Sequence, residues 1–120
     1  MSLEQHLDHL LTQYAPASRL EDVQLVEVGA DDYDGSGLPI VRQASLAEPA
    51  AYAARFSKLL ASGYSWLNLS FYGLLDGRPL IAVELPRGGV NSATTSVNYS
   101  GPSKAIADAG GDARAGVALR

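Results

Sequence analysis

Apolar side chains near the N-terminus recur at helical spacing. Over residues 3–14 they follow the pattern i, i+4, i+7, i+8, i+11, which gathers them on one face of a helix. Ser2 and Gln5 have the spacing of a capping box, in which each satisfies a free N–H at the helix start. Pro16 cannot continue a helix. We therefore predict a helix over residues 3–14.

The chain then changes to a pattern typical of strands. Residues 22–28, DVQLVEV, are rich in β-branched residues and roughly alternate between apolar and polar, which predicts a strand. Residues 29–37, GADDYDGSG, have the composition of a loop. Residues 38–43, LPIVRQ, favour a short edge strand or an irregular one, because Pro39 lacks the N–H that pairing requires.

A second helix is predicted over residues 46–62. Its start has two alternatives: a capping box in SLAE, residues 45–48, or a start at Ala47 or Glu48 with Pro49 at the first helical position, N1. Gly63 is well placed to end the helix. The residues that share its apolar face are Tyr52, Phe56, Leu59 and Leu60.

Residues 64–86 predict a β-hairpin with two alternative registers. A two-residue turn at Asp76-Gly77 mixes apolar and polar residues on both faces. A three-residue loop, residues 75–77, pairs Phe71 with Ile81 and gathers one clean apolar face. We therefore predict the three-residue loop. The opposite face then carries aromatic residues at its ends and polar residues in the middle.

The remaining segments are less regular. PRGG, residues 86–89, predicts a turn, and the β-prone residues 90–99 predict a third antiparallel strand. Residues 101–120 have the pattern of a weak helix, because each glycine in a helix interior costs about 1 kcal/mol relative to alanine. Either this helix breaks at GGD, with Asp112 as a new N-cap, or its small residues allow close packing on the sheet.

These elements predict one α+β domain over residues 1–120. Its antiparallel sheet has three to five strands, with the helices packed mainly on one face and the order α-β-(β)-α-β-β-β-α. The 120 residues are 47% apolar and 18% charged, enough apolar material for one core.

The composition of the chain limits its possible chemistry and its location in the cell. The chain contains no cysteine, which excludes disulfides, thiolate metal sites and cysteine nucleophiles. No stretch has the length of a membrane span, and the N-terminus lacks the basic and apolar regions of a signal peptide. We therefore expect a cytoplasmic protein without membrane contact.

The charge is negative and unevenly distributed. The formal net charge is −4, and the pI is about 4.9. Nucleic-acid binding is disfavoured, because it requires a basic surface. No lysine or arginine lies between Arg19 and Arg42, whereas six carboxylates lie within residues 21–34. Such a stretch either keeps the protein in solution or attracts a basic partner.

Residues 32–37, DYDGSG, resemble the first half of a calcium-binding loop. The resemblance then ends, because Pro39 takes the eighth position and Gln43 replaces the closing glutamate. We interpret the segment as a mobile acidic turn between two extended segments rather than a metal site. His6 and His9 have a spacing that allows metal ligation, but no third ligand is evident, and we expect both side chains to face solvent.

No sequence motif for catalysis is found. The segment PRGGVNSATTS, residues 86–96, has glycines and hydroxyl groups that suit an anion cradle, but it lacks the phosphate-loop spacing, and a hairpin turn explains it equally well. No nucleophile elbow, HExxH motif or dinucleotide fingerprint is present. We predict no cofactor, no metal site and no catalytic residue.

The leading functional hypothesis is a non-enzymatic protein-interaction module. Size, acidity and an amphipathic first helix are similar to those of bacterial secretion chaperones and toxin-immunity proteins, although no motif is shared. The expected partner is another protein, with a second copy of the chain, giving a homodimer, as one option. The residues predicted to contact this partner are Asp31, Asp32, Tyr33 and Asp34.

The alternative hypothesis is a small-molecule-binding protein or small enzyme. Its pocket would lie on the second face of the 65–86 hairpin, where polar groups lie between aromatic ones. The residues predicted to contact the ligand are Trp66, Asn68, Tyr72, Glu84 and Arg87.

Overall fold

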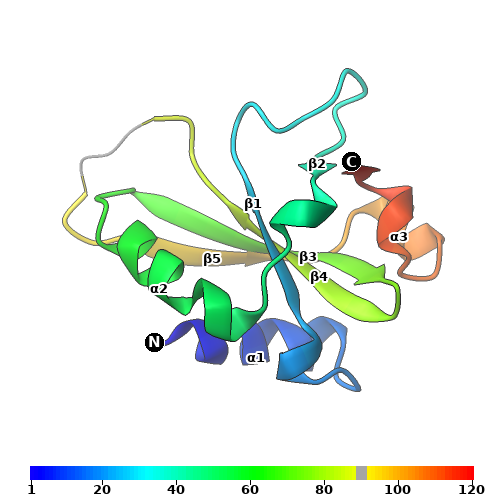
Figure 1. Ribbon diagram of the computed structural model, residues 1–120, viewed down its shortest axis with the longest axis horizontal. Helices are drawn as coiled ribbons and strands as arrows, with labels where there is room; N and C mark the ends of the chain where they lie inside the picture. The colour runs from blue at the N-terminus through cyan, green and yellow to red at the C-terminus, as the bar shows by residue number, and fades with distance from the viewer. Residues whose placement is uncertain (89–91) are drawn as a thin grey trace.

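The computed structural model describes residues 1–88 and 92–120 as an α+β fold built on one mixed sheet. Figure 1 shows α1 and α2 on one side of this sheet, and α3 with the loop between β1 and β2 on the other. The helices are α1 (Leu3–Tyr14), α2 (Pro49–Leu60) and α3 (Lys104–Asp108). The sheet strands, in spatial order, are β1 (Gln24–Val28), β4 (Arg78–Glu84), β3 (Trp66–Leu75) and β5 (Ser96–Ser100). A separate small sheet pairs β2 (Ile40–Val41) with β6 (Ala118–Leu119).

The prediction of a purely antiparallel sheet is wrong. Among the strand pairs of this sheet that the structure describes, only β3 and β4 are antiparallel, whereas β1 runs parallel to β4 and β5 runs parallel to β3. Because β1 occupies the outer edge of β4, the chain that leaves β4 has to cross to the free edge of β3. It arrives where β3 begins, since Trp66 pairs with Ser96, and therefore continues in the direction of β3.

The predicted order of elements also lacks β6, which closes a small sheet with β2. Residues 90 and 91 of the strand predicted over 90–99, and residue 89 of the predicted turn, lie outside the described residues. The two long helices lie on one face as expected, but the short α3 covers part of the other.

Both long helices begin as local chemistry requires. Ser2 and Gln5 form the predicted capping box at the start of α1. Pro49 occupies the start of α2, and Glu48 at the N-cap makes no side-chain cap. The second of the two predicted starts is therefore confirmed for α2, and the capping box in SLAE does not form.

The hairpin has the predicted strand pairing, but its turn differs from the predicted turn. Phe71 pairs with Ile81, as the sequence predicts. The turn, however, contains two residues, Asp76 and Gly77, both with positive φ, and it pairs Leu75 with Arg78. An irregularity between Phe71 and Leu74 restores the apolar register. The sequence prediction of a three-residue loop is therefore wrong, because it did not include this bulge.

Gly73 lies at the bulge and has φ +94°. It allows the backbone of β3 to approach the C-terminal segment, where the Leu74 N–H donates to the Gly111 carbonyl at 2.7 Å. The chain breaks its helix at Gly110 and Gly111, and the Asp112 side chain caps the next turn. This is the first of the two arrangements predicted for residues 101–120.

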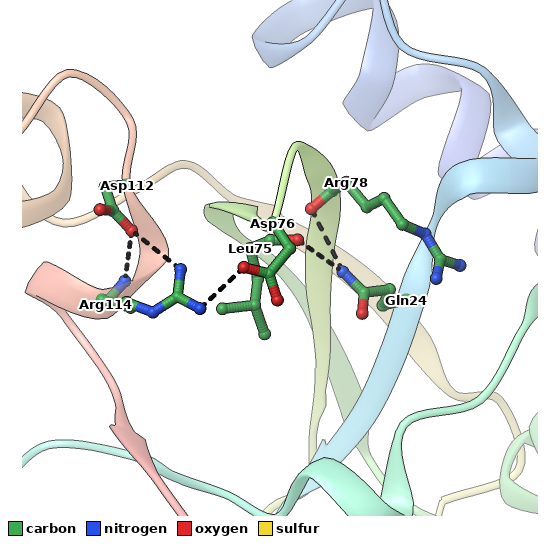
Figure 2. A network of polar contacts seen from close by, with 6 residues as sticks. All are labelled: Gln24, Leu75, Asp76, Arg78, Asp112 and Arg114. Atoms are coloured by element: carbon green, nitrogen blue, oxygen red, sulfur yellow. Dashed lines mark hydrogen bonds and ion pairs between the residues drawn. The ribbon is translucent and has the colours of Figure 1, made fainter.

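The hairpin tip is tied to both of its neighbours by polar contacts (Figure 2). On one side, Gln24 Nε2 donates to the Leu75 carbonyl at 3.1 Å and to that of Arg78 at 3.4 Å. On the other side, Arg114 Nη2 donates to Asp76 Oδ1 at 2.8 Å. These contacts hold the turn between β1 and the C-terminal segment.

The first face of the sheet packs on α1 and α2 and includes a histidine that was expected to face solvent. His6 is only 6% exposed, and its Nδ1 forms a hydrogen bond with the Tyr99 hydroxyl. The His9 ring stacks on Tyr99 at 4.5 Å between centroids. The expectation that both histidines face solvent fails for His6, because β5 carries Tyr99 against α1.

We expect the burial of His6 to make the protein less stable in mild acid. Burial, with smaller effects from the N-terminal ammonium and His9, lowers the pKa of His6 below its ordinary 6.5. The unfolded chain therefore binds the proton first, so the free energy of unfolding falls as pH drops through 6.5, by at most about 1.4 kcal/mol per pH unit. Urea unfolding of the protein and of His6→Gln between pH 7.5 and 5.5 measures this slope. An unchanged slope in the variant would contradict the assignment to His6.

Candidate functional site

The second face of the sheet carries a row of polar residues from three adjacent strands. Asn68 of β3 pairs with Glu84 of β4 on one side and with Asn98 of β5 on the other. Two residues further along β3, Ser70 pairs with Ser100. Because side chains alternate along a strand, these groups lie on one face while their apolar neighbours enter the core of the other face.

Glu84 is the charged centre of this row. Its Oε1 accepts a hydrogen bond from Asn68 Nδ2, and its Oε2 accepts one from the Tyr72 hydroxyl at 3.0 Å. The Asn68 amide is itself oriented, since its Oδ1 accepts from the Ser100 hydroxyl at 3.2 Å. Within residues 1–88 and 92–120, no basic side chain lies within ion-pair distance of Glu84. The site therefore presents a fixed carboxylate with no cationic partner from that part of the chain.

Two hollows meet at Glu84. One, of about 380 Å³, is bordered by Trp66, Asn68 and Asn98, and the other, of about 370 Å³, by Tyr72 and residues of α3. Tyr33 and Glu84 line both hollows. We call this pair of hollows the Glu84 trough, defined by Tyr33, Trp66, Asn68, Tyr72 and Glu84.

The walls of the trough include two exposed aromatic side chains. Tyr33 is 43% exposed and Trp66 is 37% exposed. Among the described residues, they are the only exposed large apolar side chains besides Met1. Exposed aromatic rings beside a fixed polar group are typical of a binding surface.

The acidic loop of residues 31–37 places Tyr33 in the trough. Asp34 Oδ1 accepts from the N–H groups of Ser36 and Leu38, both at 2.9 Å, and Tyr33 forms an isolated bridge with Pro39. Asp32 accepts from the Gly29 N–H at 2.8 Å and forms an ion pair with Arg42. These contacts all lie within residues 29–42 and fold the loop on itself, as a turn requires, and the loop residues Tyr33, Leu38 and Pro39 line the hollow beside Tyr72.

The surroundings of the trough make Tyr33 and Tyr72 weaker acids than an ordinary tyrosine. Burial, followed by the negative charges of Glu84 and Asp32, raises the pKa of Tyr33 above its ordinary value. Burial and the adjacent Glu84 likewise raise the pKa of Tyr72. Both hydroxyl groups therefore remain hydrogen-bond donors, and the local field favours a positively charged group.

The structure brings together four of the five residues predicted to contact a ligand. Trp66, Asn68, Tyr72 and Glu84 all line the trough, whereas Arg87 is exposed and lines neither hollow. Of the four residues predicted to contact a protein partner, Tyr33 joins the trough. The remaining three are Asp31, which is exposed, and Asp32 and Asp34, which accept hydrogen bonds within the loop.

Sequence reasoning did not foresee that Tyr33 and Asn98 would meet Asn68. A signal for Asn98 exists, because the tripeptides NLS, residues 68–70, and NYS, residues 98–100, have the same alternation and lie in register. The candidate anion cradle of residues 86–96 lies partly outside the described residues. The two histidines lie on the first face, beside Tyr99, and not in the trough.

The fold and the site together define an α+β protein that carries an aromatic-walled trough around a fixed carboxylate. Comparison with protein families, with curated proteins and with solved structures finds no match for the chain. The helices within residues 1–88 and 92–120 include none long and apolar enough to cross a membrane.

Proposed function

We propose that this chain is a non-enzymatic interaction module that holds a positively charged side chain of a partner protein in the Glu84 trough. The observation that carries the proposal is a fixed carboxylate, Glu84, in a hollow that two exposed aromatic side chains, Trp66 and Tyr33, also line. A cation is attracted by the carboxylate and by the faces of the rings at the same time.

Net charge supports a basic partner. The protein carries a formal net charge of −4, and the loop that borders the trough contains Asp31, Asp32 and Asp34. A negative field over the binding surface increases the rate at which a basic protein arrives, and a half-buried carboxylate then supplies the specific contact. The acidic loop and the polar hairpin face thus belong to one surface in this proposal.

We expect the peptide Ac-Gly-Ala-Xaa-Ala-Gly-NH₂ to bind when Xaa is arginine or lysine, and not when it is norleucine or glutamate. Glu84→Gln removes the charge and keeps the shape, and we expect it to weaken binding of the cationic peptides about tenfold, equivalent to ~1.4 kcal/mol. Titration followed by amide chemical shifts measures the affinity. Trp66 is the only tryptophan, so its fluorescence provides a second signal from the trough itself.

Glu21→Gln is the matched control. Glu21 is exposed, lines neither hollow of the trough and pairs with Arg19 at the surface. The substitution makes the same chemical change and the same change of net charge, and we expect it to leave affinity within about twofold. Equal weakening of binding by Glu84→Gln and Glu21→Gln would show that the affinity depends on net charge and not on the trough. If neither cationic peptide binds the protein, the proposal is overturned.

A small-molecule ligand is the second candidate function. Each hollow has a volume within the range of ligand pockets, which is about 300–1,000 Å³. N-acetyl-arginine amide and N-acetyl-lysine amide carry the same side chains without a peptide on either side. If they bind as tightly as the pentapeptides, the trough recognises a small cation, and if they bind at least about tenfold more weakly, the flanking peptide contributes as expected for a protein partner.

A further inference from the structure

We propose that the cation recognised by the Glu84 trough is the guanidinium of arginine rather than an ammonium. This inference rests on the proposed function and specifies its partner. It depends on how the carboxylate of Glu84 is held, and not only on its charge.

The two oxygens of Glu84 are held by separate donors. Asn68 Nδ2 donates to Oε1 and the Tyr72 hydroxyl donates to Oε2, and both donors belong to β3. Tyr72 is 7% exposed, so its hydroxyl has little freedom to move away. Two donors at opposite ends of one carboxylate fix the plane of that carboxylate as well as its position.

A carboxylate offers about four acceptor positions, so one remains on each oxygen after these two bonds. In the proposed complex these two positions face the hollow that Glu84 lines, where the two parallel N–H groups of a planar guanidinium fork pair with both at once. An ammonium is a compact point charge and does not gain from a fixed carboxylate plane. The arrangement around Glu84 therefore favours the planar cation.

The aromatic walls favour the same choice. Trp66 and Tyr33 are exposed side chains that line the hollow beside Glu84. A guanidinium stacks on aromatic faces and is more weakly hydrated than an ammonium, so it loses less on entering a partly apolar hollow. Both the carboxylate and the rings thus select arginine over lysine.

We expect the arginine pentapeptide Ac-Gly-Ala-Arg-Ala-Gly-NH₂ to bind about tenfold more tightly than its lysine counterpart. Methylguanidinium and methylammonium, compared in the same amide-shift titration, should show the same preference without a peptide. Tyr72→Phe keeps the ring but removes the donor to Oε2. We expect it to lower arginine affinity about threefold and to leave lysine affinity unchanged, which reduces the ratio of the two affinities.

The outcomes separate this inference from the proposed function. Equal binding of the two pentapeptides, or tighter binding of lysine, would overturn the arginine preference and leave the proposed function standing. Binding of neither pentapeptide would overturn the proposed function itself. An arginine preference that survives Tyr72→Phe unchanged would overturn the role given to the fixed carboxylate plane. Methylguanidinium that binds as tightly as the arginine pentapeptide would support guanidinium recognition and identify a small compound as its source.

Discussion

Gly73→Ala is expected to lower the free energy of unfolding by about 3 kcal/mol or more, because a methyl group there meets two obstacles at once. A Cβ at this position would lie 2.5 Å from the Gly111 carbonyl oxygen and 2.7 Å from Ile106 Cγ2. The backbone also has φ +94°, which L side chains rarely adopt. The contact with the Gly111 carbonyl oxygen involves backbone, so rotation of a side chain cannot relieve it. Denaturant unfolding measures the loss.

Two other glycines each present one of these two effects, the positive φ or the steric crowding, without the other. Gly77 has φ +76° with nothing within 4 Å of an added Cβ, so Gly77→Ala tests conformation alone. Gly116 has an ordinary φ of −133°, but its added Cβ would lie 2.5 Å from Ile106 Cγ1, so Gly116→Ala tests crowding alone. We expect each control to cost about 1–2 kcal/mol. If Gly73→Ala costs no more than Gly77→Ala, the close approach of β3 to the C-terminal segment is contradicted.

Glu27→Ala is expected to lower the free energy of unfolding by about 2 kcal/mol, because it breaks the polar link between β1 and α2. Glu27 Oε1 accepts from the Tyr52 hydroxyl and from Arg55 Nε, both at 2.6 Å, and Oε2 accepts from Arg55 Nη2 at 3.2 Å. Tyr52 is buried, so its hydroxyl would lose its acceptor without gaining full access to water. Denaturant unfolding at pH 7 measures the loss.

The same link has a pH dependence of definite sign. Burial alone would raise the pKa of Glu27, but hydrogen bonds from Arg55 and Tyr52 together hold it below its ordinary 4.5. The stabilisation is therefore complete above pH 4.5 and is lost as pH falls through the lowered pKa.

Tyr52→Phe, which keeps the ion pair, should cost about 1 kcal/mol. A loss in Glu27→Ala that is no larger than the loss in Tyr52→Phe would show that Arg55 adds nothing.

Local features of the sequence predicted local structure well. The capping box of Ser2 and Gln5, and Pro49 at the start of α2, are confirmed because a helix start depends on residues within one turn of it. The pairing of Phe71 with Ile81 is confirmed as well, because one clean apolar face is required of a strand that covers a core. The predicted three-residue turn was wrong because a bulge at Gly73 produces the same register with a two-residue turn. The glycine itself is the only indication of this bulge in the sequence.

The candidate site was predicted in part for the same reason. Trp66, Asn68, Tyr72 and Glu84 lie together because they belong to one face of one hairpin, which alternation alone predicts. Tyr33 lies more than thirty residues away in sequence from Trp66, and no periodicity connects them. It reaches the trough only because the loop between β1 and β2 folds over the second face.

The sequence by itself determined the long helices, the central hairpin, the composition of each of its faces and the acidity of the loop. These features follow from the spacing and chemistry of residues that are close in sequence. The tertiary structure alone decided that β1 occupies the outer edge of β4, that β5 therefore runs parallel to β3, that His6 is buried under Tyr99, and that Tyr33 lines a trough with Glu84. Each of these depends on which edge or face another segment leaves free, and that is a property of the assembled chain.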